Sequence, residues 1–239
     1  MSAGSASDRV CIALDFPARA DAVTMAKRLA GRAGWMKVGL EAFVAEGPAV
    51  VAEVASASRA KVFLDLKFHD IPATVAGAVA SAARAGAAMV NVHASGGRAM
   101  LEAAREAADR AGLERLIAVT LLTSLDARAL ADLPIAGHPE GIARRLALLA
   151  KAGGLDGVVC AVTDLPGIRE ACGNDFFTVV PGIRPAGADV QDQKRVATPA
   201  SAIAAGADLL VIGRPVTAAA DPEAALEAVL EEIAAAHRT

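Results

Sequence analysis

Two hydrophobic patterns alternate along the chain and predict eight strand–helix units. Short runs rich in Val, Ile and Leu are typical of buried strands, and longer Ala-rich segments with apolar residues three or four apart are typical of helices. Strands are expected at 9–14, 35–38, 62–66, 87–92, 116–122, 157–161, 176–180 and 209–212. Helices are expected at 19–30, 43–56 with an interruption at 47–48, 72–85, 95–111, 139–152, 165–171, 198–205 and 221–237.

This order of elements predicts an α/β fold with a parallel sheet. Eight units in 239 residues fit a single-domain (β/α)8 TIM barrel better than an open doubly wound sheet. The open sheet normally needs fewer units, and no G-x-G-x-x-G motif follows the first strand. Residues 1–8 are small and polar, and we expect them to form a flexible N-terminal extension of the one catalytic domain, 1–239.

Unusual polar residues end or follow most of the predicted strands, at the end of the barrel where active sites lie. They are Asp15, Lys37, Asp65, Lys67, His93, Thr123, Arg184 and Arg214. Each has a structural alternative: Asp15 could cap the next helix, Lys37 could extend to solvent, and His93 could be a hydrogen-bonded core histidine. Their coincidence on one rim favours a functional site.

The stretch 62–74, V-F-L-D-L-K-F-H-D-I-P-A-T, places three charges at one strand end. Asp65 and Lys67 are two residues apart and should share a face of the strand, and Asp70 follows in a loop. One interpretation is a surface ion pair with Asp70 capping the next helix. The other is catalytic. A lysine among carboxylates keeps its proton, which makes Lys67 a general acid rather than a Schiff-base nucleophile.

The last two units resemble each other and indicate an anion site. Gly182 and Arg184 follow the seventh strand, and Gly213 and Arg214 follow the eighth. Loops at these positions often bind phosphate in TIM barrels, where glycine permits close backbone approach and arginine gives bidentate hydrogen bonds. The long loop that carries Gln193 could close over the ligand. The alternative is an ordinary surface loop with two exposed arginines.

Composition argues against several classes of partner. The net charge is −3, and the chain has no Tyr and one Trp, so neither a basic patch nor stacking platforms for nucleic acid are expected. No apolar run reaches the ~20 residues of a membrane span. Three cysteines without a C-x-x-C motif indicate reduced thiols and a cytoplasmic protein.

Motifs for metal and serine-hydrolase chemistry are absent from the sequence. There is no H-E-x-x-H, no G-x-S-x-G and no histidine cluster. Asp65 and Asp70 could in principle hold a divalent ion, but Lys67 between them already supplies positive charge. We therefore expect no metal and no cofactor.

Together these motifs resemble the orotidine 5′-phosphate decarboxylase family along nearly the whole chain. The resemblance rests on the stretches 14–15, 37–39, 65–74, 119–124, 181–184, 192–195 with 198–199, and 212–215. It implies conversion of orotidine 5′-phosphate to UMP and CO2, the last step of de novo pyrimidine synthesis, without metal or cofactor.

The resemblance also implies a role for each site residue. Lys67 would protonate C6 of the pyrimidine, and Asp65 would hold Lys67 and face the substrate carboxylate. The other assignments are Asp15 and Lys37 on the ribose hydroxyls, Thr123 beside the pyrimidine, and Arg184, Gln193, Gly213 and Arg214 on the phosphate. Asp70 and Thr74 would cross a homodimer interface into the partner's site.

Two alternatives remain open from the sequence. A sugar-phosphate branch of the same superfamily has a related D-x-K-x-x-D motif and would require a divalent ion on the carboxylates. A non-catalytic barrel that senses a nucleotide would explain the two arginine loops, but it would leave Asp65, Lys67 and Asp70 without a purpose.

Overall fold

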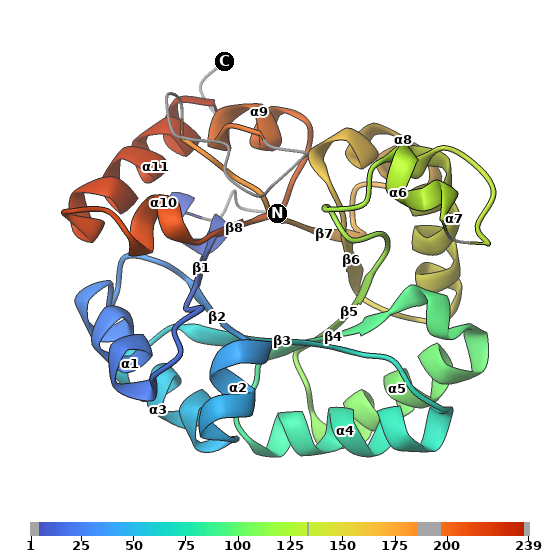
Figure 1. Ribbon diagram of the computed structural model, residues 1–239, viewed down its shortest axis with the longest axis horizontal. Coiled ribbons are helices and arrows are strands. Elements are labelled where there is room, and N and C mark those ends of the chain that lie inside the picture. The colour runs from blue at the N-terminus through green and yellow to red at the C-terminus, as the bar shows by residue number, and fades with distance from the viewer. Residues whose placement is uncertain (1–4, 133, 186–196, 237–239) are drawn as a thin grey trace.

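A closed barrel of eight parallel strands, surrounded by helices, forms the architecture of the computed structural model (Figure 1). The structure describes residues 5–132, 134–185 and 197–236. Each strand pairs with its sequence neighbours, and β8 closes the barrel against β1. The predicted fold class is confirmed.

The strands and helices alternate as expected. The strands are β1 Val10–Ala13, β2 Trp35–Gly39, β3 Lys61–Phe68, β4 Met89–His93, β5 Arg115–Val119, β6 Gly157–Val159, β7 Phe177–Val180 and β8 Leu209–Ile212. The α-helices are α1 Arg19–Arg28, α2 Leu40–Glu46, α3 Ala49–Ser58, α4 Pro72–Arg84, α5 Arg98–Ala111, α6 Ala127–Ala131, α7 Pro139–Ala152, α8 Leu165–Cys172, α9 Pro199–Ala204, α10 Arg214–Thr217 and α11 Pro222–Ala236.

Side chains alternate along each strand between the barrel interior and the surrounding helices. The interior cluster consists of Cys11, Ala13, Trp35, Phe63, Met89, Ile117, Val179, Leu209 and Val211. The intervening positions, such as Ile12 and Leu64, join the larger core beneath the helices. Because the period is two, every second residue toward a strand's carboxyl end continues the inward-facing row.

Several elements differ from the sequence prediction in their limits, the short helices α6 and α10 were not predicted, and three differences bear on the site. The predicted helix 43–56 is two helices, α2 and α3, separated at Gly47, whose φ of +72° breaks the helical path. Strand β3 continues to Phe68, so Lys67 lies within the strand, as Asp65 does, rather than just after it. Strand β5 ends at Val119, and the predicted continuation to residue 122 is a loop.

Part of the predicted N-terminal extension belongs to the fold. Residues Ala6–Arg9 form a 3-10 turn, and the carbonyl of Ser7 accepts a hydrogen bond from Gly34 N at 2.8 Å. Asp221 caps the start of α11, since its Oδ1 accepts from Ala224 N at 3.1 Å. In the described part of the chain, no helix is both long and apolar enough to cross a membrane.

Candidate active site

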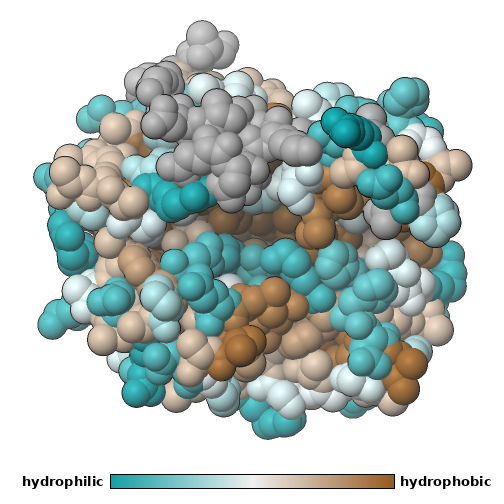
Figure 2. All heavy atoms as spheres, in the orientation of Figure 1, coloured by the Kyte–Doolittle hydropathy of each residue, from teal (hydrophilic) through white to brown (hydrophobic). Residues whose placement is uncertain are grey.

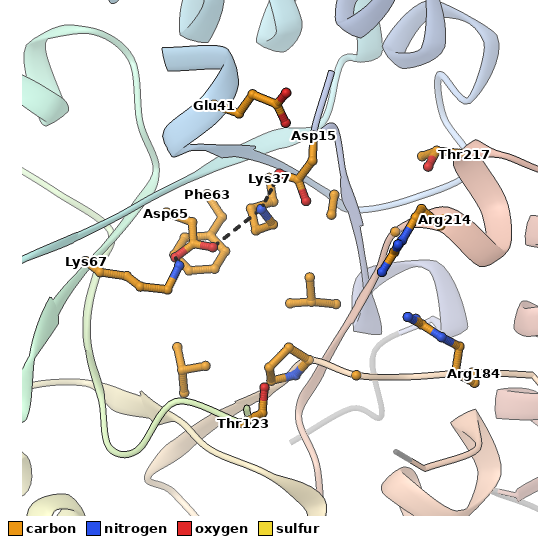
Figure 3. Close-up of a pocket in the computed structure, with 16 residues that line it drawn as sticks. Asp15, Lys37, Glu41, Phe63, Asp65, Lys67, Thr123, Arg184, Arg214 and Thr217 are labelled. Atoms are coloured by element: carbon orange, nitrogen blue, oxygen red, sulfur yellow. Dashed lines mark hydrogen bonds and ion pairs between the residues drawn. The ribbon is translucent and has the colours of Figure 1, made fainter. Parts of the chain in front are cut away.

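A cavity of about 580 Å³ opens at the carboxyl ends of the strands, within the usual size range of small-molecule sites (Figures 2 and 3). Its lining residues are Ala13, Asp15, Lys37, Glu41, Phe63, Asp65, Lys67, Thr123, Val159, Pro181, Gly182, Arg184, Val211, Gly213, Arg214 and Thr217. Most of the charged ones were predicted from strand ends. The cavity therefore brings those separate signals into one site.

Strand periodicity explains why charges follow apolar residues into the mouth of the barrel. Phe63 fills the interior, and Asp65, two residues on, is at the level of the cavity floor. The same step leads from Trp35 to Lys37 on β2. The inward-facing rows thus change from apolar to charged side chains at one height along the barrel, which is where the apolar interior ends and the cavity begins.

Side chains at the carboxyl ends of β1, β2 and β3 form a continuous ionic chain across the cavity floor, which Figure 3 shows as dashed lines. Lys67 Nζ donates to Asp65 Oδ1 at 2.7 Å, and Lys37 Nζ lies 3.4 Å from Asp65 Oδ2. Lys37 Nζ also donates to Asp15 Oδ1 at 2.7 Å. Two ammoniums and two carboxylates therefore alternate. Lys67 lies at one end of this series of ion pairs, and Asp15 lies at the other.

Burial and charge have opposing effects on this array. Burial alone would raise the pKa of Asp65, but Lys37 and Lys67, with hydrogen bonds from Lys67 and Asn91, outweigh it and lower the pKa. Burial alone would lower the pKa of Lys37, but Asp65 and Asp15 outweigh it and raise the pKa. Both residues are thus held in their charged forms.

Lys67 occupies an unusual backbone conformation. Its φ is +52°, in the left-handed region, which costs a non-glycine residue roughly 1–2 kcal/mol. Its N–H donates to Asn91 Oδ1 at 2.8 Å, while Asn91 Nδ2 donates to Asp65 Oδ1 at 2.7 Å. Such strain at a cavity wall is typical of functional sites, where surrounding contacts maintain it.

The opposite wall of the cavity carries two arginines, Arg184 and Arg214, which point inward in Figure 3. Arg184 is 8% exposed, and its Nε has no hydrogen-bond partner within the described residues. Burial lowers the pKa of Arg184, and the charge of Arg214 lowers it further. Two neighbouring guanidiniums repel each other, so this wall is electrostatically prepared for an anion.

Two glycines, Gly182 and Gly213, lie near these arginines in the sequence and line the same cavity. Gly182 has a φ of +77°, which strains residues with a side chain. A Cβ on Gly213 would come 3.6 Å from Ala13 Cβ, an ordinary contact. Both glycines line the cavity, as the sequence predicted. Because they lack side chains, their backbone is accessible from the cavity.

The comparisons with known proteins agree with this geometry. Residues 8–229 match the family model described as Orotidine 5′-phosphate decarboxylase / HUMPS family. The chain belongs to this family. It is similar to orotidine 5′-phosphate decarboxylase of Halorhodospira halophila, with 54% identity over 229 residues that cover 95% of this chain and 97% of the relative. The enzyme of the same name from Moorella thermoacetica is 52% identical over 235 residues, which cover 95% of this chain and 93% of that relative.

A solved structure supports the same relationship. The crystal structure of orotidine 5′-phosphate decarboxylase from Lactobacillus acidophilus superposes with a TM-score of 0.83 at 34% sequence identity. The match covers 95% of this chain and 99% of that chain. The family is one of carboxy-lyases, which agrees with the enzyme class expected from the sequence.

Not all predicted residues of the decarboxylase site meet in this cavity. Asp70 and Thr74 are exposed and do not line it, and Asp70 accepts a hydrogen bond from Ile71 N at 2.6 Å. The alternative that Asp70 caps α4 is wrong, because the N-cap position is Ile71 and no side chain caps it. Gln193 lies outside the described residues.

His93 is half-buried at the rim, outside the cavity lining. Its ring centroid is 5.3 Å from that of His69. Burial lowers the pKa of His93, and the nearby charges of His69 and Lys67 lower it further. These contacts place it near the array without direct access to the cavity.

Three polar residues of the site were not predicted. Glu41 of α2 and Thr217 of α10 line the cavity, and Asn91 lies behind Asp65 with 1% exposure. Asn91 could have been recognised from the sequence, because it is a polar residue within an apolar strand at the same height as Asp65. No sequence pattern pointed to Glu41 or Thr217, since both are on short helices after the strand ends.

In the described part of the chain, no three His, Cys, Asp or Glu side chains are grouped closely enough to hold a metal ion. The carboxylate of Asp65 instead has two lysine ammoniums as its cationic partners.

Proposed function

We propose that the protein converts orotidine 5′-phosphate to UMP and CO2, the last step of de novo pyrimidine synthesis, without a metal or cofactor. One observation carries the proposal: a single cavity has a lysine–carboxylate array on one wall and two arginines on the other. A nucleotide with a phosphate at one end and a reacting carboxylate at the other fits this polarity.

The phosphate binds between Arg184 and Arg214. Charge-assisted hydrogen bonds from guanidiniums to phosphate oxygens are strong and can be bidentate. The backbone beside Gly213 approaches the same anion. The family resemblance assigns Gln193, which lies outside the described residues, to the same phosphate. Binding of this remote group supplies energy that helps to place the pyrimidine against the array.

The ribose hydroxyls bind to Asp15 and Lys37, which lie between the two ends of the cavity. The side chain of Asp15 is 52% exposed, although it is paired with Lys37, and so its second oxygen can accept from a hydroxyl. Thr123 borders the pyrimidine.

Lys67 is the proton donor. The bond between C6 and the carboxylate breaks, the electron pair remains on C6, and CO2 leaves. The pair is localised in an sp² orbital, so a fixed ammonium at C6 stabilises it as it develops. A proton then moves from Lys67 Nζ to C6, and the neutral amine regains a proton from solvent. Asp65 holds the ammonium in place and faces the departing carboxylate.

A second copy of the chain completes the site. Asp70 and Thr74 are exposed, and so are the apolar side chains Leu40, Val44 and Ile71, at 52%, 78% and 66%. These follow the neighbouring strands β2 and β3, and Figure 2 shows an apolar patch beside the cavity mouth over α2. A homodimer across this surface would cover the patch and carry Asp70 and Thr74 into the partner's cavity.

The cytoplasm is the compartment we propose. All three cysteines are buried thiols, and no disulfide is present in the described chain. Reduced cysteines are the usual state there.

The test is the loss of orotidine 5′-phosphate absorbance in the presence of excess EDTA. We expect full activity after exhaustive chelation, with UMP as the product. Activity that disappears with EDTA and returns with magnesium would instead support the metal-dependent sugar-phosphate chemistry. Binding of UMP without any turnover of orotidine 5′-phosphate would support a nucleotide sensor.

A further inference from the structure

Strand β3 does not pair evenly with β4 at the active site. Leu64 is opposite Val90, and Phe68 is opposite Val92. Three residues of β3, including Asp65 and Lys67, therefore face a single residue of β4, which is Asn91. A bulge of this kind redirects side chains but leaves backbone groups without ladder partners.

The side chain of Asn91 supplies one missing backbone partner and also binds the carboxylate of Asp65. Its Oδ1 accepts from the N–H of Lys67 at 2.8 Å, and its Nδ2 donates to Asp65 Oδ1 at 2.7 Å. This orientation is fixed chemically, because a backbone N–H can only donate and an ionised carboxylate can only accept. One amide thus holds both the left-handed backbone of Lys67 and the carboxylate that pairs with its ammonium.

Asn91 cannot act on substrate directly. It is 1% exposed and does not line the cavity, and Asp65 and Lys67 lie between it and the open space. Its two hydrogen bonds end on those two residues. Any effect of Asn91 on the reaction must therefore pass through the position of the Asp65–Lys67 pair.

We propose that Asn91 is the positioning residue of the active site, which holds Lys67 in its bulged conformation and aims its ammonium at the reacting carbon. This rests on the proposed function, in which Lys67 donates the proton. The same amide keeps Asp65 Oδ1 shared between Lys67 Nζ and Asn91 Nδ2, so that the carboxylate cannot rotate freely.

The first test is Asn91→Ala, which removes both hydrogen bonds. We expect kcat for orotidine 5′-phosphate to fall roughly 10–100-fold, because a displacement of about 1 Å at a reacting group has an effect of this size. We expect KM and the dissociation constant of UMP to stay within about threefold, since the arginine wall is untouched. The stoichiometry of UMP binding measures the folded, competent fraction and corrects kcat for it.

Thr120→Val is the matched control. Thr120 is 3% exposed, follows the neighbouring strand β5, and donates its hydroxyl to the carbonyl of Val159 at 2.9 Å. That carbonyl keeps a second donor, Thr120 N at 3.1 Å. The control removes one buried polar group near the same rim without contact to the Asp65–Lys67 pair, and we expect kcat to be unchanged.

Asn91→Asp provides a second test that preserves side-chain shape. It keeps the acceptor for Lys67 N–H but places a carboxylate against Asp65, and a like charge at this distance raises the pKa of a carboxyl group. The other charged or titratable groups facing Asp65 are Lys37 from β2, Lys67 from β3, His93 from β4 and Cys11 from β1. Since these are unchanged, we expect the acid limb of kcat/KM to move to higher pH.

The outcomes separate this inference from the proposed function. If wild-type protein turns over orotidine 5′-phosphate and Lys67→Ala does not, the function stands. A kcat of Asn91→Ala near that of wild type would then overturn the role of Asn91 alone. A pH profile of Asn91→Asp that superposes on wild type would do the same, even if Asn91→Ala failed to fold. Absence of turnover by wild type would overturn both.

Discussion

Asp65 organises the charges of the site at the level of single residues. It accepts from Lys67 and lies beside Lys37, which also pairs with Asp15. The array is close to neutral as a whole, whereas the wall with Arg184 and Arg214 is positive. Under the proposed function, an anionic nucleotide therefore has one favourable orientation, with its phosphate on the arginines and its base on the array. Removal of Asp65 would leave two ammoniums without their buried counter-ion.

The arginine wall gives a prediction at this scale. Arg184→Ala should raise the KM for orotidine 5′-phosphate roughly 10–100-fold, because a hydrogen bond to a charged group contributes about 1.5–3 kcal/mol. Steady-state kinetics measure it. Arg98→Ala, at an exposed arginine on α5, is the control and should leave KM unchanged. An unchanged KM in Arg184→Ala would exclude this arginine from the phosphate site.

At the scale of elements, three adjacent strands must bring their charged residues to matched heights for the ionic chain to form. Asp15 follows β1, Lys37 is in β2, and Asp65 is in β3. The pairs Ala13–Lys37 and Gly39–Asp65 in the sheet register set this height. Gly39 leaves the space in which the side chains of Asp15 and Lys37 meet, since a Cβ there would lie 2.6 Å from Asp15 Oδ1 and 2.9 Å from Lys37 Nζ.

Gly39→Ala should therefore damage the site more than the fold. The backbone φ of Gly39 is −95°, which any residue adopts, and the colliding atoms are the ends of side chains. We expect the variant to fold with a melting temperature near that of wild type and to lose about 10–100-fold in kcat/KM. Gly141→Ala in α7, where a Cβ meets nothing within 4 Å, is the control. Equal kinetics for the two variants would contradict the proposed packing.

Much of the barrel could be predicted because its strands are short apolar runs with helices between them. The rim residues Asp15, Lys37 and Arg184 could be predicted for the same reason, since charges are rare at the ends of such runs. The bulge in β3 could not, because it depends on the register with β4 and on the side chain of Asn91. The division of α2 from α3 was visible only as a possible interruption, since Gly47 and Pro48 permit both a kink and a break.

At the scale of the whole molecule, a single chain has only part of the predicted catalytic set in its cavity. Asp65 and Lys67 belong to their own barrel, whereas Asp70 and Thr74 face outward from the β3–α4 connection and the first turn of α4. The exposed apolar residues Leu40, Val44 and Ile71 are on the same side of the strand ends. This distribution agrees with a site that is shared between two copies.

Subunit mixing tests the shared site. Lys67→Ala and Asp70→Ala should each be inactive alone, but a mixed dimer would contain one site with Lys67 and Asp70 both intact. We expect a 1:1 mixture, after subunit exchange, to regain up to about a quarter of wild-type activity if the subunits pair at random. No recovery despite exchange verified by mass-labelled subunits would count against Asp70 crossing an interface.

The most direct test of the proposed chemistry is the rate at which Lys67→Ala decarboxylates orotidine 5′-phosphate, compared with wild type under the same conditions. We expect no measurable turnover, with UMP still bound, because the arginine wall remains while the proton donor is missing. A rate near that of wild type would contradict the role of Lys67 and the mechanism built on it.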